Sequence, residues 1–489
     1  MEATLSESGE WAGFWWIASE PDAKHPGVLH FDPARGLELR LIGGWEYEAE
    51  LPHAPGVTTG QLKDWPMVHG RMADGTPVTL LHLFVSAVKR THSRYKASEA
   101  PDHLHLHADI ALVGHHLQHP AAPEFVAVSA TVENLTVWSS RSGIHHSRHR
   151  DGPYSRGVQL GRLGVIEAET EALTVTLDHW DVVTRQSTRS RSSALVEEWD
   201  AIRFRSTTPQ PLSSWLDLVA GVADLMSLSM LRASAVIGIR LLLPTAPGDP
   251  AHHRERPEVQ LLQHRVTQAR PDEASELHHH ALMTLDDVDF ATLMPRWLAV
   301  RERFAAARGM VLGLQYVPDG YLENRVVTAV AAAESMHRSL DPAPPIPAED
   351  FRRLRKTLLD QVAPDYKQWL AERLTSHANV PSLRERLVDL ATRIGEPGSA
   401  LVGDVERWAS AAKNARNQIA HLGSAQEEVL RMHALVEVTS GVVVLNLLHE
   451  LGMTEDQLMR SVTRHPKLSF AASLARSHFA NARPSPHTN

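Results

Sequence analysis

The spacing of apolar residues changes once along this chain, and that change constrains the fold more than any other feature. From about residue 13 to 210, apolar residues fall in short alternating or β-branched segments such as GVLHF, LELRLIG and TPVTLLHLF. Alternation is the period of a half-buried β-strand. Asp74 and Gly75 lie between two such segments and predict a hairpin. The first part of the chain is therefore expected to form a β-rich sheet or sandwich.

Residues 211–305 combine both patterns before a helical period takes over. PLSSWLDLVAGVADLMSLSML predicts a helix, ASAVIGIRLLL a buried strand, and APGDPAHHRERPE a loop. From PRWLAVRERFAAARGM onwards the spacing is helical. We therefore predict an α+β protein with three parts: a β-rich N-terminal domain at 1–300, an all-α helical bundle at 301–481 and a disordered tail at 482–489.

Local signals divide the second part into separate helices. Ser382 with Glu385, and Thr454 with Gln457, have the capping-box spacing that begins a helix. The stretch DPAPPIPA predicts a linker between helices. EEVLRMHALVEVTSGVVVLNLLHEL is apolar on most sides, which is typical of the central, buried helix of a bundle.

Charge and composition narrow the class of protein. The formal net charge is -9, so any contact with nucleic acid must use a local patch. The absence of cysteine excludes disulfides, thiolate metal sites and a cysteine nucleophile. The acidic start MEATLSESGEW does not resemble a signal sequence, and Arg232 and Arg240 interrupt the longest apolar run. We expect a cytoplasmic protein that does not span a membrane.

One predicted helix, at about 403–422, carries a compact polar group. Its apolar stripe consists of Val405, Trp408, Ala412, Ala415, Ile419 and Leu422. At about 100° per residue, four polar residues fall on an arc of roughly 140° outside that stripe: Lys413, Arg416, Asn417 and His421. Ala409 and Ala420 lie on the same arc, so a nucleic-acid backbone or another helix has room to come close.

The spacing of this group suggests how it works. Asn417 and His421 are one turn apart and can form a hydrogen bond that orients the imidazole. Arg416 and His421 lie at opposite edges of the arc, so one chain alone would splay them apart. A symmetric dimer is expected to bring them into one cleft.

These residue types suit RNA cleavage without a metal ion. An imidazole ordinarily titrates near neutral pH and can accept the proton of a ribose 2′-OH. The alkoxide then attacks the adjacent phosphate, while a guanidinium binds the phosphate oxygens. The expected products are a 2′,3′-cyclic phosphate and a 5′-OH, and DNA should resist.

The spacing by itself is weakly specific. Arginine five residues before histidine also occurs at Arg141 with His146 and at Arg460 with His465. Only the copy at Arg416 is followed by asparagine and backed by an apolar stripe. From the residues alone, a solvated helix face therefore remains the competing interpretation.

Two other sequence features contain residue types found in binding sites. His103, His105 and His107 alternate, so they share one face of a strand, close in sequence to Asp102 and Asp109. More histidines follow at His115, His116, His119, His278, His279 and His280. Without an H-E-x-x-H pattern, we expect surface histidines, no metal site and no cofactor. The basic run FRRLRK predicts either a solvated face or a place where RNA phosphates dock.

The motif resembles that of a known family. Residues 416–421, RNQIAH, match the R-N-x-x-x-H pattern of HEPN domains, which are helical-bundle ribonucleases and nucleotide-binding modules. YLENRVVTAVAAAESMHRSL and PSLRERLVDL resemble the HEPN domain of ApeA-type anti-phage defence proteins. HPGVLHFDPARGLELRLIGGW and ALVGHHLQHPAAPEFVAVSATVENLTVW resemble the N-terminal domain of the same proteins, so the resemblance covers nearly the whole chain in the expected order.

The resemblance implies a HEPN endoribonuclease that aborts phage infection by cutting host RNA, such as tRNA. It implies that His421 is the base, Arg416 the phosphate binder and Asn417 an orienting residue; we add Lys413 as a substrate-binding residue. Glu334 lies where the family often has an acidic residue.

The resemblance also bears on partners. The N-terminal domain would sense a phage-derived protein trigger and restrain the nuclease, and the protein would form a dimer or higher oligomer. The alternative is a non-catalytic HEPN module that binds nucleotide or RNA, or a scaffold that recognises a protein or carbohydrate.

Overall fold

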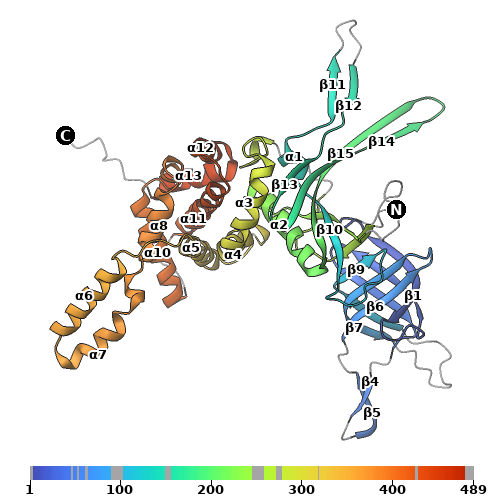
Figure 1. Ribbon diagram of the computed structural model, residues 1–489, viewed down its shortest axis with the longest axis horizontal. Coiled ribbons are helices and arrows are strands. Elements are labelled where there is room, and N and C mark those ends of the chain that lie inside the picture. The colour runs from blue at the N-terminus through green and yellow to red at the C-terminus, as the bar shows by residue number, and fades with distance from the viewer. Residues whose placement is uncertain are drawn as a thin grey trace. The chain divides into compact units, whose positions relative to one another are not determined.

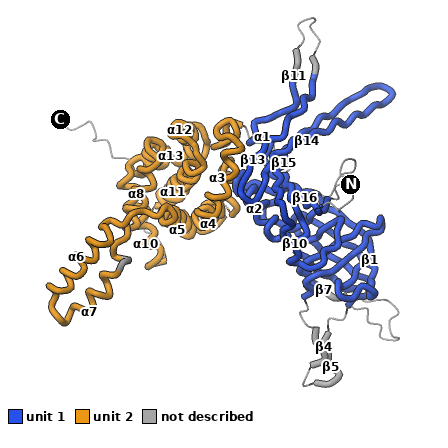
Figure 2. Tube along the Cα trace, in the orientation of Figure 1, with its two compact units in different colours: residues 1–226, 233–276 blue, residues 227–232, 277–489 orange. Residues whose placement is uncertain are grey.

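The computed structural model describes residues 4–45, 48–51, 54–60, 64–89, 103–148, 156–244, 258–270, 278–317, 319–423 and 428–479. The chain divides into two compact units (Figure 1, Figure 2). The first contains residues 1–226 and 233–276, and the second contains residues 227–232 and 277–489. The predicted loop APGDPAHHRERPE, apart from its last residue, and the predicted tail lie outside the described residues.

The first unit is built on one sheet of thirteen strands. The strands of this sheet, in chain order, are β1 (Gly9–Ile17), β2 (His25–Asp32), β3 (Gly36–Ile42), β6 (Asp64–Met72), β7 (Pro77–Lys89), β8 (His103–Ala108), β9 (Ile110–Val113), β10 (Pro123–Val132), β13 (Ile166–Glu169), β14 (Leu173–Ser187), β15 (Ser192–Pro211), β16 (Val236–Leu242) and β17 (Glu258–Gln263). Their spatial order is β13-β14-β15-β10-β16-β17-β9-β7-β6-β1-β2-β3-β8. β8 also pairs with β7, so six strands close into a ring (Figure 1).

Smaller elements complete this unit. Two separate hairpins pair β4 (Glu48–Leu51) with β5 (Ala54–Gly60), and β11 (Ile144–Arg148) with β12 (Arg156–Leu160). The short helix α1 (Leu135–Ser139) precedes β11, and the long helix α2 (Leu212–Met230) follows β15. α2 and β16 confirm the predicted helix and buried strand. The hairpin predicted at Asp74 and Gly75 is also confirmed, because it joins β6 to β7.

A pair of stacked histidines connects β6 with the segment that follows β9 in the first unit. The rings of His69 and His116 are 4.6 Å apart at an angle of 11°. Each ring binds a backbone carbonyl through Nε2: His69 donates to Leu117 O at 2.9 Å, and His116 donates to Gly70 O at 2.8 Å. Burial is the main cause that lowers the pKa of both rings below the ordinary value of 6.5.

This pair predicts that acid destabilises the first unit. A histidine with a lowered pKa binds more protons in the unfolded chain, so folding stability is lost as pH falls below about 6.5. We expect the melting temperature to drop between about pH 7.5 and pH 5.5, measured by thermal denaturation. A His69→Gln, His116→Gln double variant should lose less on acidification than wild type. An equal loss in both proteins would mean that other groups cause the acid sensitivity.

The second unit is a helical bundle, which confirms the predicted fold class. Its elements are η1 (His278–His280), α3 (Phe290–Arg303), α4 (Ala305–Tyr316), α5 (Leu322–Ser339), α6 (Ala348–Gln361), α7 (Pro364–Arg373), η2 (Ser376–Asn379), α8 (Leu383–Thr392), α9 (Glu396–Val402), α10 (Val405–Leu422), α11 (Val429–Glu450), α12 (Glu455–Arg464) and α13 (Pro466–His478).

Helix α11 is the centre of this bundle. It packs against α5, α9, α10 and α13, and most of its side chains are fully buried. By length and composition it is apolar enough to cross a membrane, yet 83% of the apolar window is buried inside the protein. The prediction of a central buried helix is confirmed.

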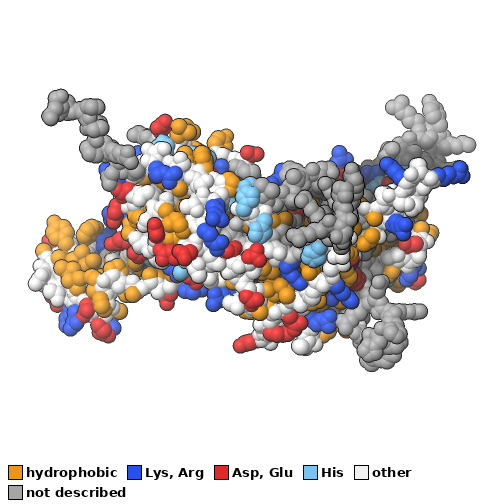
Figure 3. All heavy atoms as spheres, turned by 90° about the horizontal axis from the view of Figure 1, so that it is seen from above, with side chains coloured by type: hydrophobic (Ala, Val, Ile, Leu, Met, Phe, Trp, Pro, Cys, Tyr) orange, Lys and Arg blue, Asp and Glu red, His pale blue; other side chains and the backbone are white. Residues whose placement is uncertain are grey.

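The predicted helix caps and linker of the bundle are also present. Ser382 caps α8 and Thr454 caps α12, each with a complete capping box. The proline-rich linker joins α5 to α6. α6 and α7 form a hairpin in which neither helix has a buried residue (Figure 1), and Figure 3 shows apolar side chains gathered over this end of the bundle.

Candidate functional site

Helix α10 carries the polar group predicted from the sequence. The Asp404 side chain caps its first turn by accepting a hydrogen bond from Arg407 N at 3.0 Å. Its last turn ends at Gly423, whose positive φ of 76° lets the backbone N–H reach Ile419 O. In the first turn, Trp408 Nε1 donates to Thr439 Oγ1 of α11 at 3.2 Å. These contacts hold α10 in place as one unbroken helix.

The apolar stripe of α10 faces the core, as predicted. Trp408, Ala412 and Ala415 are fully buried, and Val405 and Ile419 are half-buried. The side chain of Leu422 lies outside the described residues. The placement of Ala409 on the open face was wrong, because Ala409 is also fully buried. The reason is that α5, α8 and α11 all pack against α10, so its buried face is wider than one stripe.

The motif residues occupy the last two turns of α10. Arg416 and Asn417 are half-buried, and the Arg416 guanidinium donates to Asn417 Oδ1 at 3.2 Å. His421 is exposed. The predicted hydrogen bond between Asn417 and His421 is absent among the described contacts, because the amide oxygen of Asn417 accepts from Arg416 instead. Asn417 therefore orients the guanidinium rather than the imidazole.

A single copy of α10 does not bring Arg416 and His421 together. The helix is regular from Arg416 to His421, so their side chains leave it about 140° apart. Within the part of the chain that the structure describes, neither His421 nor Lys413 forms a hydrogen bond or ion pair. Lys413 and His421 are thus available to a ligand or to a second copy of the bundle, and the Arg416–Asn417 pair is only half-buried.

Exposed apolar side chains lie at the same end of the bundle. Val429 and Leu430 begin α11, a few residues after His421, and are 66% and 58% exposed. Tyr321, just before α5, is 80% exposed. An ion pair between Arg325 of α5 and Glu437 of α11 places the start of α5 beside the third turn of α11. Grouped apolar exposure of this kind is typical of an interaction surface, and the sequence reading missed it because each residue looks ordinary alone.

Glu334 lies away from the motif. Its carboxylate accepts from Arg338 one turn later on α5, at 2.6 Å. Glu334 also lies close enough to Arg386 of α8 to stabilise that residue's charged form electrostatically.

Contacts between α8 and α10 indicate where Glu334 lies along α10. Arg384 of α8 contacts Glu406 and Ser410, in the first two turns of α10. Glu334 is thus level with the start of α10, whereas Arg416 and His421 are at its end. Glu334 is an arginine-paired helix residue here.

The histidine-rich segments are held by separate partners. His105 and His107 share a face of β8, as predicted, but His105 pairs with Glu38 and His107 with Leu37 O. His115 pairs with Glu124. Among the described residues, no group of three or more histidines and carboxylates is placed to hold a metal ion. Asp102 lies outside the described residues.

The basic run FRRLRK lies on α6 and is largely engaged within its own hairpin. Arg352 pairs with Glu349, and Arg353 pairs with Asp350. Arg355 donates to the carbonyl of Leu374 at the end of α7, at 2.6 Å. Arg355 thus links α6 to the end of α7, whereas Arg352 and Arg353 pair within α6. The role of the run in docking RNA stays a prediction.

Two family models match the chain. One, described as ApeA N-terminal domain 1, matches residues 10–297, which is more than half of the chain. The other, described as Apea-like HEPN, matches residues 327–457. The chain belongs to the ApeA family. The resemblance predicted from the sequence is thus confirmed, and the protein is a HEPN protein of anti-phage defence.

The HEPN match includes the motif on α10 and all of α11. Both ApeA-type domains occur in the expected order, the β-rich one first. No curated protein and no solved structure matches the chain. The functional argument therefore depends on the family and on the geometry of α10.

Proposed function

We propose that this ApeA-type protein is a metal-independent endoribonuclease, active as a symmetric dimer or higher oligomer in the cytoplasm. The observation that supports this most directly is the end of α10. There, a half-buried Arg416–Asn417 pair and an exposed His421 occupy the HEPN motif of one regular helix.

The arrangement suits an in-line attack by a ribose hydroxyl. His421 takes the proton from the 2′-OH, and the resulting alkoxide attacks the adjacent phosphorus. The bond to the 5′-oxygen breaks, and that oxygen takes a proton from water. Arg416 stabilises the extra negative charge of the transition state, with its guanidinium already oriented by Asn417. Lys413, one turn before Arg416, attracts the RNA backbone.

The separation of Arg416 and His421 on the helix favours a site shared by two subunits. A symmetric dimer could have two equivalent clefts, with each bundle contributing His421 to one and Arg416 to the other. Alternatively, both residues of both bundles would line one shared cleft. The exposed apolar residues Val429 and Leu430 follow the motif closely along the chain, and Tyr321 precedes a helix that packs against α11. All three would be buried in such an interface. Dimerisation through this surface would therefore complete the active site.

The biological setting is proposed from the family. A nuclease of this kind acts on host RNA, with tRNA as the first candidate, and must stay inactive until infection. The β-rich ApeA domain is the part that would restrain it and respond to a phage-derived protein.

The proposal predicts a specific pattern of RNA cleavage. Purified protein mixed with phage lysate should cleave total RNA to products ending in 2′,3′-cyclic phosphate and 5′-OH, and cleavage should be weaker without the lysate. Cleavage should continue at an unchanged rate in excess EDTA, because no step requires a metal ion. A substrate with 2′-O-methyl ribose at the cut position should resist completely, since it has no proton to remove.

Other outcomes have clear meanings. Loss of cleavage in EDTA, or cutting of the 2′-O-methyl substrate, would contradict the proposed chemistry. RNA binding without cleavage, in both the presence and absence of phage lysate, would identify a non-catalytic HEPN module.

A further inference from the structure

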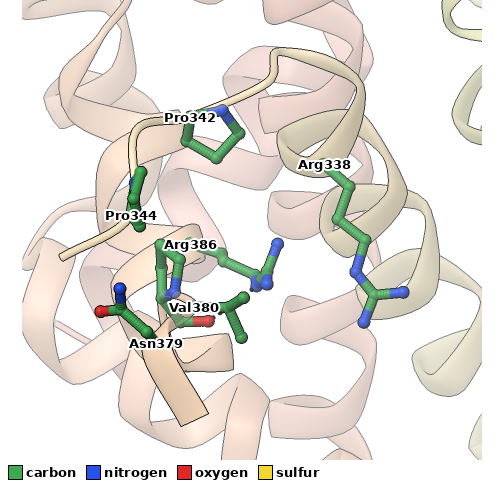
Figure 4. Close-up of a pocket in the computed structure, with 7 residues that line it drawn as sticks. Arg338, Pro342, Pro344, Asn379, Val380 and Arg386 are labelled. Carbon is green, nitrogen blue, oxygen red and sulfur yellow. Dashed lines mark hydrogen bonds between the residues drawn. The ribbon is translucent and has the colours of Figure 1, made fainter. Parts of the chain in front are cut away.

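A cavity of about 440 Å³ lies in the second unit, away from the motif on α10. It is enclosed by the end of α5, the proline-rich linker and the segment that leads into α8 (Figure 4). Its lining residues are Arg338, Pro342, Pro344, Asn379, Val380, Pro381 and Arg386. The volume is in the range of small-ligand sites, and the walls are apolar except for the two guanidinium groups and the amide of Asn379.

Arg386 is the unusual residue of this cavity. Its side chain is only 6% exposed, and its Nε donates to the carbonyl of Pro381 at 2.9 Å. No carboxylate among the described residues lies within ion-pair distance of it. Burial and then the nearby Arg338 lower the pKa of Arg386, so the fold holds a cation where a cation is disfavoured. Buried charges are normally paired, which makes this one a candidate ligand group.

The orientation of Arg386 supports a binding role. Figure 4 shows its guanidinium directed across the cavity toward the helix that carries Arg338. Because Nε is already bound to Pro381, the two terminal nitrogens are the ones that face the cavity. Asn379 is not available to a ligand, since both ends of its amide bind the backbone of Ile346. Recognition would thus depend on Arg386 and the apolar walls.

Arg338 provides a second cation at the rim. It is 65% exposed and paired with Glu334, and an exposed ion pair contributes little stability. Arg338 can therefore exchange Glu334 for a ligand oxygen. Two guanidinium groups from different helices suit a tetrahedral phosphate, whose oxygens point in several directions, better than a planar carboxylate.

We propose that this cavity binds the phosphate group of a nucleotide, either free or within an RNA strand, with Arg386 as its principal ligand. The sugar or base of the same nucleotide would rest against Pro342, Pro344 and Val380. The site is distinct from the cleavage motif, and its occupation does not depend on whether the domain cuts RNA.

The test is ligand-dependent thermal stability of the full-length protein carrying His421→Ala, which avoids cleavage. Four probes are compared at equal ionic strength: potassium chloride, inorganic phosphate, uridine or adenosine 5′-monophosphate, and a short 2′-O-methyl RNA. Once the ligand concentration exceeds the dissociation constant, each further tenfold increase in ligand concentration should raise the melting temperature by about 3 to 5 °C. A response to monophosphates identifies a free nucleotide, and a response to the oligomer alone identifies an RNA strand.

Substitutions make the test specific. Arg386→Met should abolish the response without lowering the melting temperature of the free protein, because replacing an unpaired buried charge by an apolar side chain is seldom destabilising. Arg386→Lys should weaken binding by about tenfold, since lysine lacks the planar fork. The matched control is Arg384→Met, which removes a charge two positions away that pairs with Glu406.

Three results would overturn the proposal. One is the absence of any stabilisation beyond that given by chloride. Another is an unchanged response in the Arg386→Met protein. The third is an equal loss of response in the Arg384→Met control, which would indicate general charge attraction. Failure of RNA cleavage by the wild-type protein leaves these measurements unaffected, so the two proposals fail separately.

Discussion

Alanine in place of His421 is expected to slow RNA cleavage by about 10²- to 10⁴-fold, the usual contribution of a general base. That loss corresponds to about 3 to 5 kcal/mol of transition-state stabilisation. His421 is exposed and has no described partner, so its removal should change the melting temperature very little. The rate is measured with a fluorescent RNA of the cleaved sequence, and folding is followed by thermal denaturation of the same samples.

The matched control for this variant is His449→Ala. His449 is also an exposed histidine in the last turn of a helix, but it ends α11, whereas His421 ends α10. It should keep wild-type activity. Similar losses of activity in both variants would mean that any histidine of the bundle contributes equally. A parallel loss of folding and activity in the His421→Ala variant would mean that His421 has a structural role.

Features set by local sequence were predicted best. The capping boxes at Ser382 and Thr454 depend on hydrogen bonds within one turn, and both are complete. The buried positions of Trp408 and Ala412 follow from helical spacing alone. The break between β-rich and helical parts could be read because the apolar period changes from two to nearly four residues.

Features that depend on neighbouring helices were not predictable. Ala409 is buried because helices α5, α8, α9 and α11 all pack against α10, which no pattern within α10 reveals. The partner of Asn417 could not be chosen either, since both Arg416 and His421 are within reach along the helix and only the folded geometry decides. The apolar surface near the motif combines residues about a hundred positions apart.

Arg386 illustrates a signal that was present but overlooked. In PSLRERLVDL, Leu383, Leu387 and Leu390 form the apolar face of α8, and Arg386 falls beside them at helical spacing. A charged residue is normally found at the surface, so helical spacing alone does not indicate that Arg386 is buried. Its burial beside a cavity became visible only when the linker and α5 were in place.

Alanine in place of Arg416 is expected to reduce cleavage by about 10²- to 10³-fold, as removal of a charge-stabilising donor does in other active sites. Arg416→Lys should recover only part of this loss, because the ammonium group cannot reproduce the fork that Asn417 orients. Arg407→Ala is the control, since Arg407 is an exposed arginine of the same helix paired locally with Asp404. Single-turnover rates at saturating RNA separate the loss of catalysis from weaker binding.

Co-assembly of the two inactive variants tests whether the site is shared. If one cleft combines His421 of one subunit with Arg416 of the other, a mixed dimer of the His421→Ala and Arg416→Ala chains contains one intact cleft. Random mixing gives half of all dimers this composition, so activity should recover to about one quarter of wild type. If both residues act from the same chain, every cleft lacks one group and the mixture stays inactive. If activity recovers after co-refolding but not after brief mixing of preformed dimers, exchange of subunits is required. The active site is then completed only when two HEPN domains assemble.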